Sequence, residues 1–372
     1  MMKVLITGSN GFIGKNLKLS LKERDDIEII SFNREHNYLS LISTLKSVDF
    51  IFHLAGVNRS NKEEDFYTGN SNFTKKLCEA IRKSNCKAPI IFTSSIQAGQ
   101  NSPYGQSKLA AELSLKDLNK NLSNPIYIFR LPNVFGKWSK PNYNSVVSTF
   151  CHNITRDIPI HIENKKKVVE LVYIDDVIKK FIELMYGIEI KNKTNSQEFV
   201  TQTYKITLGE LAEQLYAFKK MTKSKTLENV GTGLIRALYS TYISYLPAEK
   251  FSYPISKTKD SRGIFVEILK TKNCGQFSYF TAPPGVTRGD HYHHSKTEKF
   301  VVIKGKACFK FFHMDTKAKY ELNTSCKNPE IVETIPGWAH NIKNTGKKDL
   351  IAILWANENF NKEKPDTIHY KL

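Results

Sequence analysis

Long hydrophobic runs are missing from this sequence. No run of about 18 apolar residues occurs, whereas a helix that crosses a bilayer needs about 20 such residues. The segment from Lys3 to Thr7 already has the composition of a buried strand, which leaves no room ahead of it for a signal peptide. We therefore expect a soluble, cytoplasmic protein that does not bind membranes.

Closely spaced cysteines are missing as well. No pair has the spacing of a metal or redox motif, and Cys78 lies within an apolar helical pattern. We expect free thiols at Cys78, Cys86, Cys151, Cys274, Cys308 and Cys326.

Acidic residues are few relative to basic ones. The sequence has 36 Asp and Glu against 55 Lys and Arg, which gives a net charge of +19. The basic residues are spread along the chain, and no basic helix or aromatic-basic strand pattern occurs, so we expect no nucleic-acid partner. We interpret the charge as a generally basic surface, of which a few residues serve a diphosphate ligand.

The first half of the 372-residue chain alternates short apolar runs with amphipathic stretches. This rhythm is typical of βαβ units and predicts an α/β Rossmann domain, in which helices cover both faces of a parallel sheet. Ligands of such sheets bind at the carboxyl ends of the strands. The expected strands are Val4–Thr7, Ile27–Phe32, Asp49–Ala55, Pro89–Thr93 and Pro125–Arg130.

The pattern changes near Leu246 to short strands separated by Gly, Pro and Asn, such as Gly275–Thr281, Lys299–Ile303 and Ala307–Phe312. We expect an α/β domain over residues 1–245 and an all-β jelly-roll barrel over residues 246–372. Five of the ten histidines fall between residues 291 and 340 of the second domain, which suggests a site there: His291, His293, His294, His313 and His340.

A glycine-rich loop, Thr7–Gly14, follows the first expected strand and opens a helix, so its backbone N–H groups can hold a pyrophosphate. About twenty residues later, where an acidic residue would bind the ribose of NAD, the sequence has Arg34, which favours the 2′-phosphate of NADPH. Glu35 follows directly and weakens that preference. We expect NADPH to contact Gly8, Asn10, Gly11, Phe12, Ile13, Gly14 and Arg34.

Tyr104 and Lys108 are four residues apart and project from one helix face. An ammonium so placed lowers the pKa of the phenol, which can then give a proton to a carbonyl oxygen while a hydride reaches the carbon. Ser95, at the end of the preceding strand, can hydrogen-bond the same oxygen, and Ser94 is the alternative. We expect Ser95, Tyr104 and Lys108 to be catalytic.

These motifs resemble those of the extended short-chain dehydrogenases, the group of nucleotide-sugar epimerases and dehydratases. The resemblance covers about residues 1–245 and implies that Leu54, Ala55, Gly56, Tyr104 and Lys108 contact the cofactor and that Asn133 contacts the nucleotide sugar. His53 and Asp176 we otherwise interpret as structural. The matching segments are Thr7–Gly14, Asp49–Gly56, Asn70, Tyr104–Lys108, Arg130–Gly136 and Tyr173–Val177.

The segments Gly285–Gly305 and Pro336–Asn344 resemble the two motifs of the cupins. His291 and His293 lie two apart on one strand, so both imidazoles point into the barrel, and Glu298 and His340 can complete a shell of three nitrogens and one oxygen. Such a shell suits zinc, or another divalent metal such as nickel, iron or manganese. We expect these four residues to bind the metal.

A second resemblance overlaps the cupin motifs. Asp260–Glu267 and Arg288–His291 are similar to segments of cupin-fold 4-keto epimerases of deoxysugars, which abstract a proton beside a ketone. Many of these enzymes use a histidine base and no metal. Because we treat His291 as a metal ligand and Arg288 as a substrate contact, the base stays unassigned, with Lys296 and Tyr292 as candidates.

A reductase joined to an epimerase-like cupin resembles the family of bifunctional capsule-pathway enzymes that act in the synthesis of UDP-N-acetyl-L-fucosamine. That resemblance covers the whole chain. It implies that a UDP-linked 2-acetamido-2,6-dideoxy-4-hexulose is epimerised at C3 in the cupin and then reduced at C4 by NADPH to UDP-2-acetamido-2,6-dideoxy-L-talose. It also implies a homodimer formed through the cupin.

Two other functions stay open. The chain would be a reductase alone if its cupin served only to form a dimer, and a metal assay would decide this. It would be a cofactor-sensing regulator without activity if NADPH bound without turnover.

Overall fold

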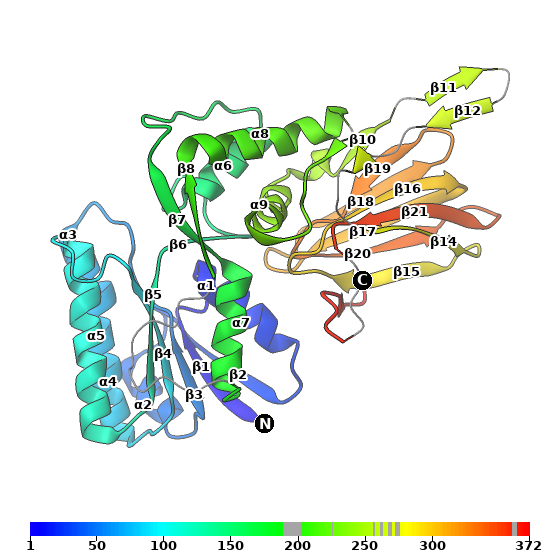
Figure 1. Cartoon of the computed structure of the whole chain (residues 1–372). Coiled ribbons are helices and arrows are strands. Elements are labelled where there is room, and N and C mark those ends of the chain that lie inside the picture. Colours follow the sequence, from blue (N-terminus) through cyan, green and yellow to red (C-terminus); the bar gives the residue numbers. More distant parts are fainter. Residues whose placement is uncertain are drawn as a thin grey trace. The chain divides into compact units, whose positions relative to one another are not determined.

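The computed structural model describes residues 1–188, 202–224, 226–255, 257–260, 263–266, 270–271, 276–358 and 363–372, and between 257 and 278 it describes the backbone alone (Figure 1). Two compact units are present, residues 1–134 with 170–205, and residues 135–169 with 206–372. The expected domain boundary between residues 245 and 246 stays a prediction.

The first unit contains a five-stranded sheet of order β2-β1-β3-β4-β5 in which every neighbouring pair is parallel. This is the sheet that the sequence predicts, with each strand at its expected place. Its strands are β1 (Met2–Thr7), β2 (Ile27–Phe32), β3 (Phe50–His53), β4 (Ile90–Ser95) and β5 (Ile126–Leu131).

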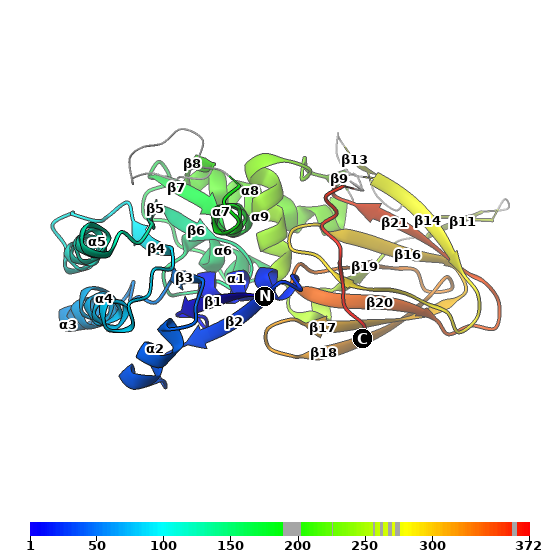
Figure 2. The same cartoon turned by 90° about the horizontal axis from the view of Figure 1, so that it is seen from below.

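Helices cover both faces of this sheet, with α2, α4 and α5 on one face and α1 and α7 on the other (Figures 1 and 2). On the face covered by α2, α4 and α5, the buried side chains of strands and helices form a hydrophobic core, in which Leu5, Ile51 and Ile90 are completely buried. The helices are α1 (Phe12–Lys22), α2 (Tyr38–Leu45), α3 (Glu63–Phe66), the π-helical η1 (Tyr67–Asn72), α4 (Phe73–Ser84), α5 (Pro103–Leu122) and α7 (Ile174–Met185).

Helix α5 begins sharply. The Ser102 side chain accepts a hydrogen bond from the backbone N–H of Gly105, and Pro103 takes the first helical position, where a missing N–H has no cost. Ser123 ends the helix in the left-handed conformation, with φ 58°. The cap at Ser102 and Pro103 fixes the start of α5, whose first two turns carry Tyr104 and Lys108.

The second unit contains two antiparallel five-stranded sheets, of order β10-β19-β16-β21-β14 and β18-β17-β20-β15-β22, which form the expected jelly roll. The strands of the first sheet are β10 (Ser252–Pro254), β19 (Glu330–Glu333), β16 (Glu298–Lys304), β21 (Leu350–Ala356) and β14 (Gln276–Ala282). Those of the second are β18 (Lys319–Ser325), β17 (Lys306–His313), β20 (Trp338–Asn344), β15 (Thr287–Tyr292) and β22 (Ile368–His369).

Helices α6 (Val146–Thr155), α8 (Leu208–Ser224) and α9 (Gly233–Ser244) also belong to the second unit. Phe218 of α8 packs edge-on against Tyr239 of α9, with ring centroids 5.1 Å apart. The Ser240 hydroxyl of α9 donates to the Ser295 carbonyl at 2.5 Å, which ties this helix to the loop after β15.

The remaining elements are short. They are the sheet β6-β7-β8 (Asn133–Phe135, Val168–Tyr173, Thr203–Thr207), the pair β9 and β13 (Thr226–Leu227, Lys270–Thr271), the hairpin β11-β12 (Lys257–Asp260, Gly263–Val266) and the 3₁₀ turn η2 (Ala248–Lys250). Within the described residues, no helix combines the length and the apolar character needed to span a membrane.

Candidate functional site

The glycine loop turns tightly between β1 and α1. Gly8 has φ +72°, and a Cβ there would lie 2.7 Å from the Ala55 backbone. A Cβ on Gly14 would lie 2.3 Å from the Gly8 carbonyl oxygen. Gly11 precedes α1 and provides no side-chain cap, so the N–H groups of the first turn have no side-chain partner from this position. The close approach of Ala55 to Gly8 and the tight turn are compatible with a dinucleotide pyrophosphate at this loop, and the contacts of the loop and of Ala55 with NADPH stay predictions.

Arg34 lies on the exposed loop after β2. The Ser9 hydroxyl donates to Asn33 Oδ1 at 3.1 Å, which links the glycine loop to the residue next to Arg34. This placement is the one expected of a residue that selects between NADPH and NADH, and the selection itself stays a prediction.

His53 is completely buried at the end of β3 between two threonines. Its Nδ1 lies 2.8 Å from Thr7 Oγ1, and its Nε2 lies 2.8 Å from Thr74 Oγ1. The Thr74 hydroxyl donates to the Asn70 carbonyl, so it must accept from His53 Nε2–H, and Nδ1 must then accept from Thr7. Burial, together with the Lys108 charge, lowers the pKa of His53 to about 3. The ring is a neutral structural residue, as predicted.

Asn70 links the segment that follows β3 to helix α5, which carries Tyr104. Its side chain accepts from the Val57 N–H at 2.8 Å and donates to the Val57 carbonyl at 2.9 Å. The same amide donates to Ser107 Oγ at 2.9 Å, and Ser107 donates to the Tyr104 carbonyl at 2.8 Å. Sequence matching marked Asn70 without giving it a role, and the structure makes it a positioning residue.

Tyr104 and Ser95 lie close together at the carboxyl end of β4. Burial raises the pKa of Tyr104, and the Ser95 hydroxyl lowers it by less. The expectation that Lys108 lowers this pKa is not met in this structure. The Lys108 Nζ instead donates to the Thr93 carbonyl at 2.8 Å, and burial lowers the pKa of Lys108 to about 8.

The choice between the two serines follows from their directions. Successive residues of a strand point to opposite faces, so Ser94 and Ser95 cannot serve the same group. The Ser94 hydroxyl donates to Glu112 Oε1 at 2.5 Å, and the Glu112 carboxylate also receives Arg130. The geometry therefore favours Ser95 beside Tyr104 and reveals Glu112, whose side chain is completely buried, as a residue that the sequence did not indicate.

The two residues predicted to contact the substrate, Asn133 and Arg288, are exposed to solvent. The Asn133 amide donates to the Glu170 carbonyl at 3.0 Å. The Arg288 guanidinium lies 5.1 Å above the centre of the Phe280 ring. Both roles stay predictions. Of the segment Asp260–Glu267, the residues Ser261, Arg262 and Glu267 lie outside the described residues.

The four predicted metal ligands meet inside the jelly roll. One donor atom from each of His291, His293, Glu298 and His340 can be chosen so that all four lie within 4.8 Å of one another. His291 on β15 pairs directly with His340 on β20, and their ring centroids are 4.7 Å apart. The other two clustered histidines of the prediction are absent from this group: His294 packs on Tyr292, and His313 packs on Trp338.

Two of the imidazoles have Nδ1 against a backbone carbonyl. His293 Nδ1 faces the Asp366 carbonyl, and His340 Nδ1 faces the Trp338 carbonyl at 3.4 Å. A carbonyl only accepts, so the facing Nδ1 carries the proton and Nε2 keeps its lone pair. The three Nε2 atoms and Glu298 Oε2 are buried without a hydrogen bond. Buried lone pairs left unmatched in this way fit a divalent cation.

Glu298 presents one oxygen to the histidines. Its Oε2 lies 3.3 Å from His293 Nε2 and 3.5 Å from His340 Nε2, while Oε1 pairs with Lys296 Nζ at 2.7 Å. Burial and the neighbouring histidines lower the pKa of His291 to about 3. Burial alone would lower the pKa of His293, but the Glu298 carboxylate more than offsets this and raises it.

The turn before His340 is closed by a tryptophan. A Cβ on Gly337 would lie 2.7 Å from the Trp138 ring, and Gly337 has φ +80°. The Trp138 and His313 ring centroids are 5.8 Å apart. This turn therefore requires glycine both for its conformation and for the indole that covers it.

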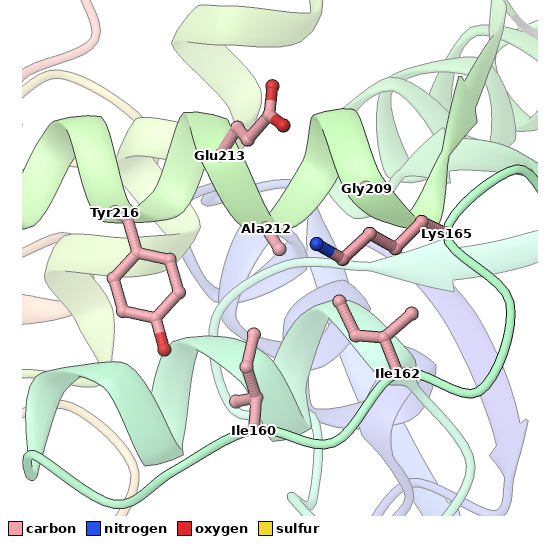
Figure 3. Close-up of a pocket in the computed structure, with 7 residues that line it drawn as sticks. All are labelled: Ile160, Ile162, Lys165, Gly209, Ala212, Glu213 and Tyr216. Atoms are coloured by element: carbon pink, nitrogen blue, oxygen red, sulfur yellow. The ribbon is translucent and has the colours of Figure 1, made fainter.

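A separate pocket of about 280 Å³ lies between α8 and the segment 160–165 (Figure 3). The side chains of Ile160 and Ile162 point toward the helix, and Lys165 reaches across the opening. Its described lining residues include none of the predicted site residues: Ile160, Ile162, Lys165, Gly209, Ala212, Glu213 and Tyr216.

Comparison with known proteins finds one family in the N-terminal part of the chain and another in the C-terminal part. Residues 4–191 match the NAD dependent epimerase/dehydratase family, and residues 258–368 match the polysaccharide biosynthesis C-terminal domain. The chain belongs to the NAD dependent epimerase/dehydratase family, with the polysaccharide biosynthesis domain following it.

Two individual proteins resemble the chain over almost its whole length. The chain is 57% identical to UDP-2-acetamido-2,6-beta-L-arabino-hexul-4-ose reductase of Pseudomonas aeruginosa over 366 residues, which cover 98% of each chain. It is similar in structure to the capsular polysaccharide assembling protein CapF of Staphylococcus aureus, with 39% sequence identity, complete coverage of both chains and a TM-score of 0.68. The predicted resemblance to capsule-pathway enzymes is confirmed.

More distant structures share the fold alone. UDP-glucuronic acid 4-epimerase of Bacillus cereus is 19% identical and covers 66% of this chain with a TM-score of 0.54.

Proposed function

We propose that this protein reduces a UDP-linked 2-acetamido-2,6-dideoxy-4-hexulose at C4 with NADPH, after inverting the same sugar at C3 in its cupin. The product is UDP-2-acetamido-2,6-dideoxy-L-talose. The observation that carries the reductase is the placement of Ser95, at the carboxyl end of β4, beside Tyr104, with Lys108 on the same helix as Tyr104. The 57% identity to a UDP-sugar keto reductase supports the substrate class.

NADPH supplies the hydride when bound. Tyr104 supplies the proton, because its raised pKa keeps the phenol protonated at neutral pH and able to donate to the C4 oxygen. Ser95 orients that oxygen through a second hydrogen bond. Lys108 is buried on the Tyr104 helix and is anchored to the Thr93 carbonyl, so it can hold the cofactor in place without moving.

The cupin step is assigned to the four-residue cluster. A divalent metal, for which zinc fits best, would be held by His291, His293, Glu298 and His340 and would polarise a carbonyl oxygen. The hydrogen at C3 is acidic only while C4 is a ketone, so epimerisation precedes reduction. The base stays unassigned, because Lys296 is paired with Glu298 and Tyr292 is buried beneath His294.

The assembly and the location follow the same proposal. We propose a homodimer through the cupin and a cytoplasmic reaction, since NADPH and UDP-linked sugars are cytoplasmic metabolites.

One assay tests both activities. The purified protein is mixed with the UDP-linked 4-keto sugar and NADPH in deuterated water, and NADPH oxidation is followed alongside NMR of the product. We expect stoichiometric oxidation and deuterium at C3. Oxidation without deuterium would leave a single-activity reductase, and NADPH binding without oxidation would leave a cofactor sensor.

A further inference from the structure

Two histidines of the metal cluster differ in where their supporting carbonyl comes from. His340 Nδ1 faces the carbonyl of Trp338, two residues earlier in its own strand. His293 instead donates its Nδ1–H to the carbonyl of Asp366, 73 residues further along the chain. The orientation of this one imidazole therefore depends on a distant segment.

The Asp366 side chain fixes that segment. Its carboxylate accepts from the backbone N–H groups of His294 and Ser295 at 2.8 Å each and of Lys296 at 2.7 Å. It also accepts from the Ser295 hydroxyl at 3.0 Å. Four donors on one partly buried carboxylate hold the turn between His293 and Glu298 in one conformation.

Backbone pairing extends the contact along the strand of the cluster. His291 pairs with His369 and Tyr292 with Ile368 in the β15–β22 ladder. The Tyr370 N–H donates to the Asp290 carbonyl at 2.7 Å. Figures 1 and 2 both place the C-terminus beside the barrel.

We propose that Asp366 is a positioning residue of the metal centre. Its carboxylate anchors the turn 294–296, and this anchor places its own carbonyl against His293, which keeps the proton on Nδ1 and the lone pair on Nε2 directed at the metal. The turn it holds also carries Lys296, the partner of Glu298, so one residue orders the surroundings of two ligands. The proposal rests on the metal site of the proposed function.

The test is metal affinity of the full-length protein. Zn²⁺ and Co²⁺ dissociation constants are measured by chelator competition for the parent, Asp366→Asn and the control Asp349→Asn. Asp349 is an exposed acid of the same unit, outside the cluster. Residues that orient metal ligands contribute about 10- to 100-fold to affinity, so we expect a loss in that range for Asp366→Asn and none for the control.

A purely structural role predicts a different result. It would lower the melting temperature of the metal-free protein and leave both dissociation constants and the Co²⁺ absorption spectrum unchanged, and that outcome overturns the proposal. If Asp366→Asn does not fold, Ser295→Ala removes one of the four bonds, and parent-like affinity of this variant is the overturning result. Failure of the parent itself to bind metal would instead refute the metal site of the proposed function.

Discussion

Glu112 of α5 and Arg130 of β5 form a bidentate ion pair, with Arg130 Nε 2.9 Å from Glu112 Oε1 and Arg130 Nη2 2.7 Å from Glu112 Oε2. The Glu112 side chain is 1% exposed and the Arg130 side chain 36%. Ser94 occupies a further position on the same carboxylate. The pair joins the helix of Tyr104 and Lys108 to the strand that leads into Asn133.

Replacing Glu112 should destabilise the first unit more than replacing a surface acid of the same helix. Glu112→Gln should lower the free energy of unfolding by about 1.5–3 kcal/mol, the range for hydrogen bonds to charged groups. Asp117→Asn, which breaks an exposed 2.7 Å pair with Arg82, should cost less than about 1 kcal/mol. Urea unfolding followed by circular dichroism measures both, and equal losses would contradict the prediction.

Tyr104→Phe should abolish reduction and spare epimerisation. Loss of a general acid lowers kcat by about 10²- to 10⁴-fold, whereas deuterium entry at C3, which we propose takes place in the cupin, should continue. NADPH oxidation and NMR of the recovered sugar are measured on one sample. Tyr67→Phe, at an exposed tyrosine, serves as the control, and full reductase activity in Tyr104→Phe would remove this residue from the mechanism.

His53 should make stability fall in mild acid. Its folded pKa of about 3 lies below the ordinary 6.5, so between these values the unfolded chain binds a proton that the folded chain excludes. Stability contributed by the neutral ring is complete above about pH 6.5 and is lost as the pH falls, at up to about 1.4 kcal/mol per pH unit.

Removing the imidazole tests this slope. His53→Asn should flatten the dependence of unfolding free energy on pH between about 6 and 4, and His36→Asn, at an exposed histidine, should leave it as in the parent. Parallel slopes for parent and His53→Asn would show that other groups set the acid sensitivity.

Arg34→Ala should reduce the preference for NADPH over NADH. The loss of a charge-assisted contact to the 2′-phosphate costs about 1.5–3 kcal/mol, or roughly tenfold or more in kcat/KM for NADPH alone. Lys22→Ala, which removes an exposed charge from α1, should not change the ratio. An unchanged ratio in Arg34→Ala would assign the selection to another residue.

His340→Ala should separate the two proposed activities by removing the epimerisation. The variant should bind metal weakly and stop deuterium from entering C3, while NADPH still binds to the first unit. Either NADPH oxidation stops or a product of the other C3 configuration accumulates, and NMR distinguishes these results. Continued inversion at C3 would exclude the cupin cluster as the epimerase.

Short-range patterns made most of the fold predictable. The five Rossmann strands and the shared face of His291 and His293 follow from local spacing that fixes which face a side chain occupies. The meeting of these two histidines with Glu298 and His340 was predicted from the resemblance of two segments to the cupin motifs. The choice between Ser94 and Ser95 needed the structure, because spacing places them on opposite faces without saying which face holds the tyrosine.

Asp366 and Glu112, which support the two sites, could not be predicted from the sequence, and the reason is a different one. Asp366 acts through a main-chain carbonyl and through backbone N–H groups, which every residue type carries, so its sequence shows no signal. Glu112 lies one turn beyond Lys108, yet only the fold brings Ser94 and Arg130 to it. The pKa of Tyr104 depends on burial and on where the Lys108 ammonium is anchored, and neither is set by a spacing of four.

The Trp138 indole that packs against Gly337 also affects what tryptophan fluorescence can report. The three tryptophans, at positions 138, 338 and 355, all belong to the second unit, and two of them line the turn that leads to His340. Intrinsic tryptophan fluorescence should therefore respond to metal and to unfolding of the barrel. It carries no direct signal from the Rossmann sheet, whose emission comes from tyrosine alone.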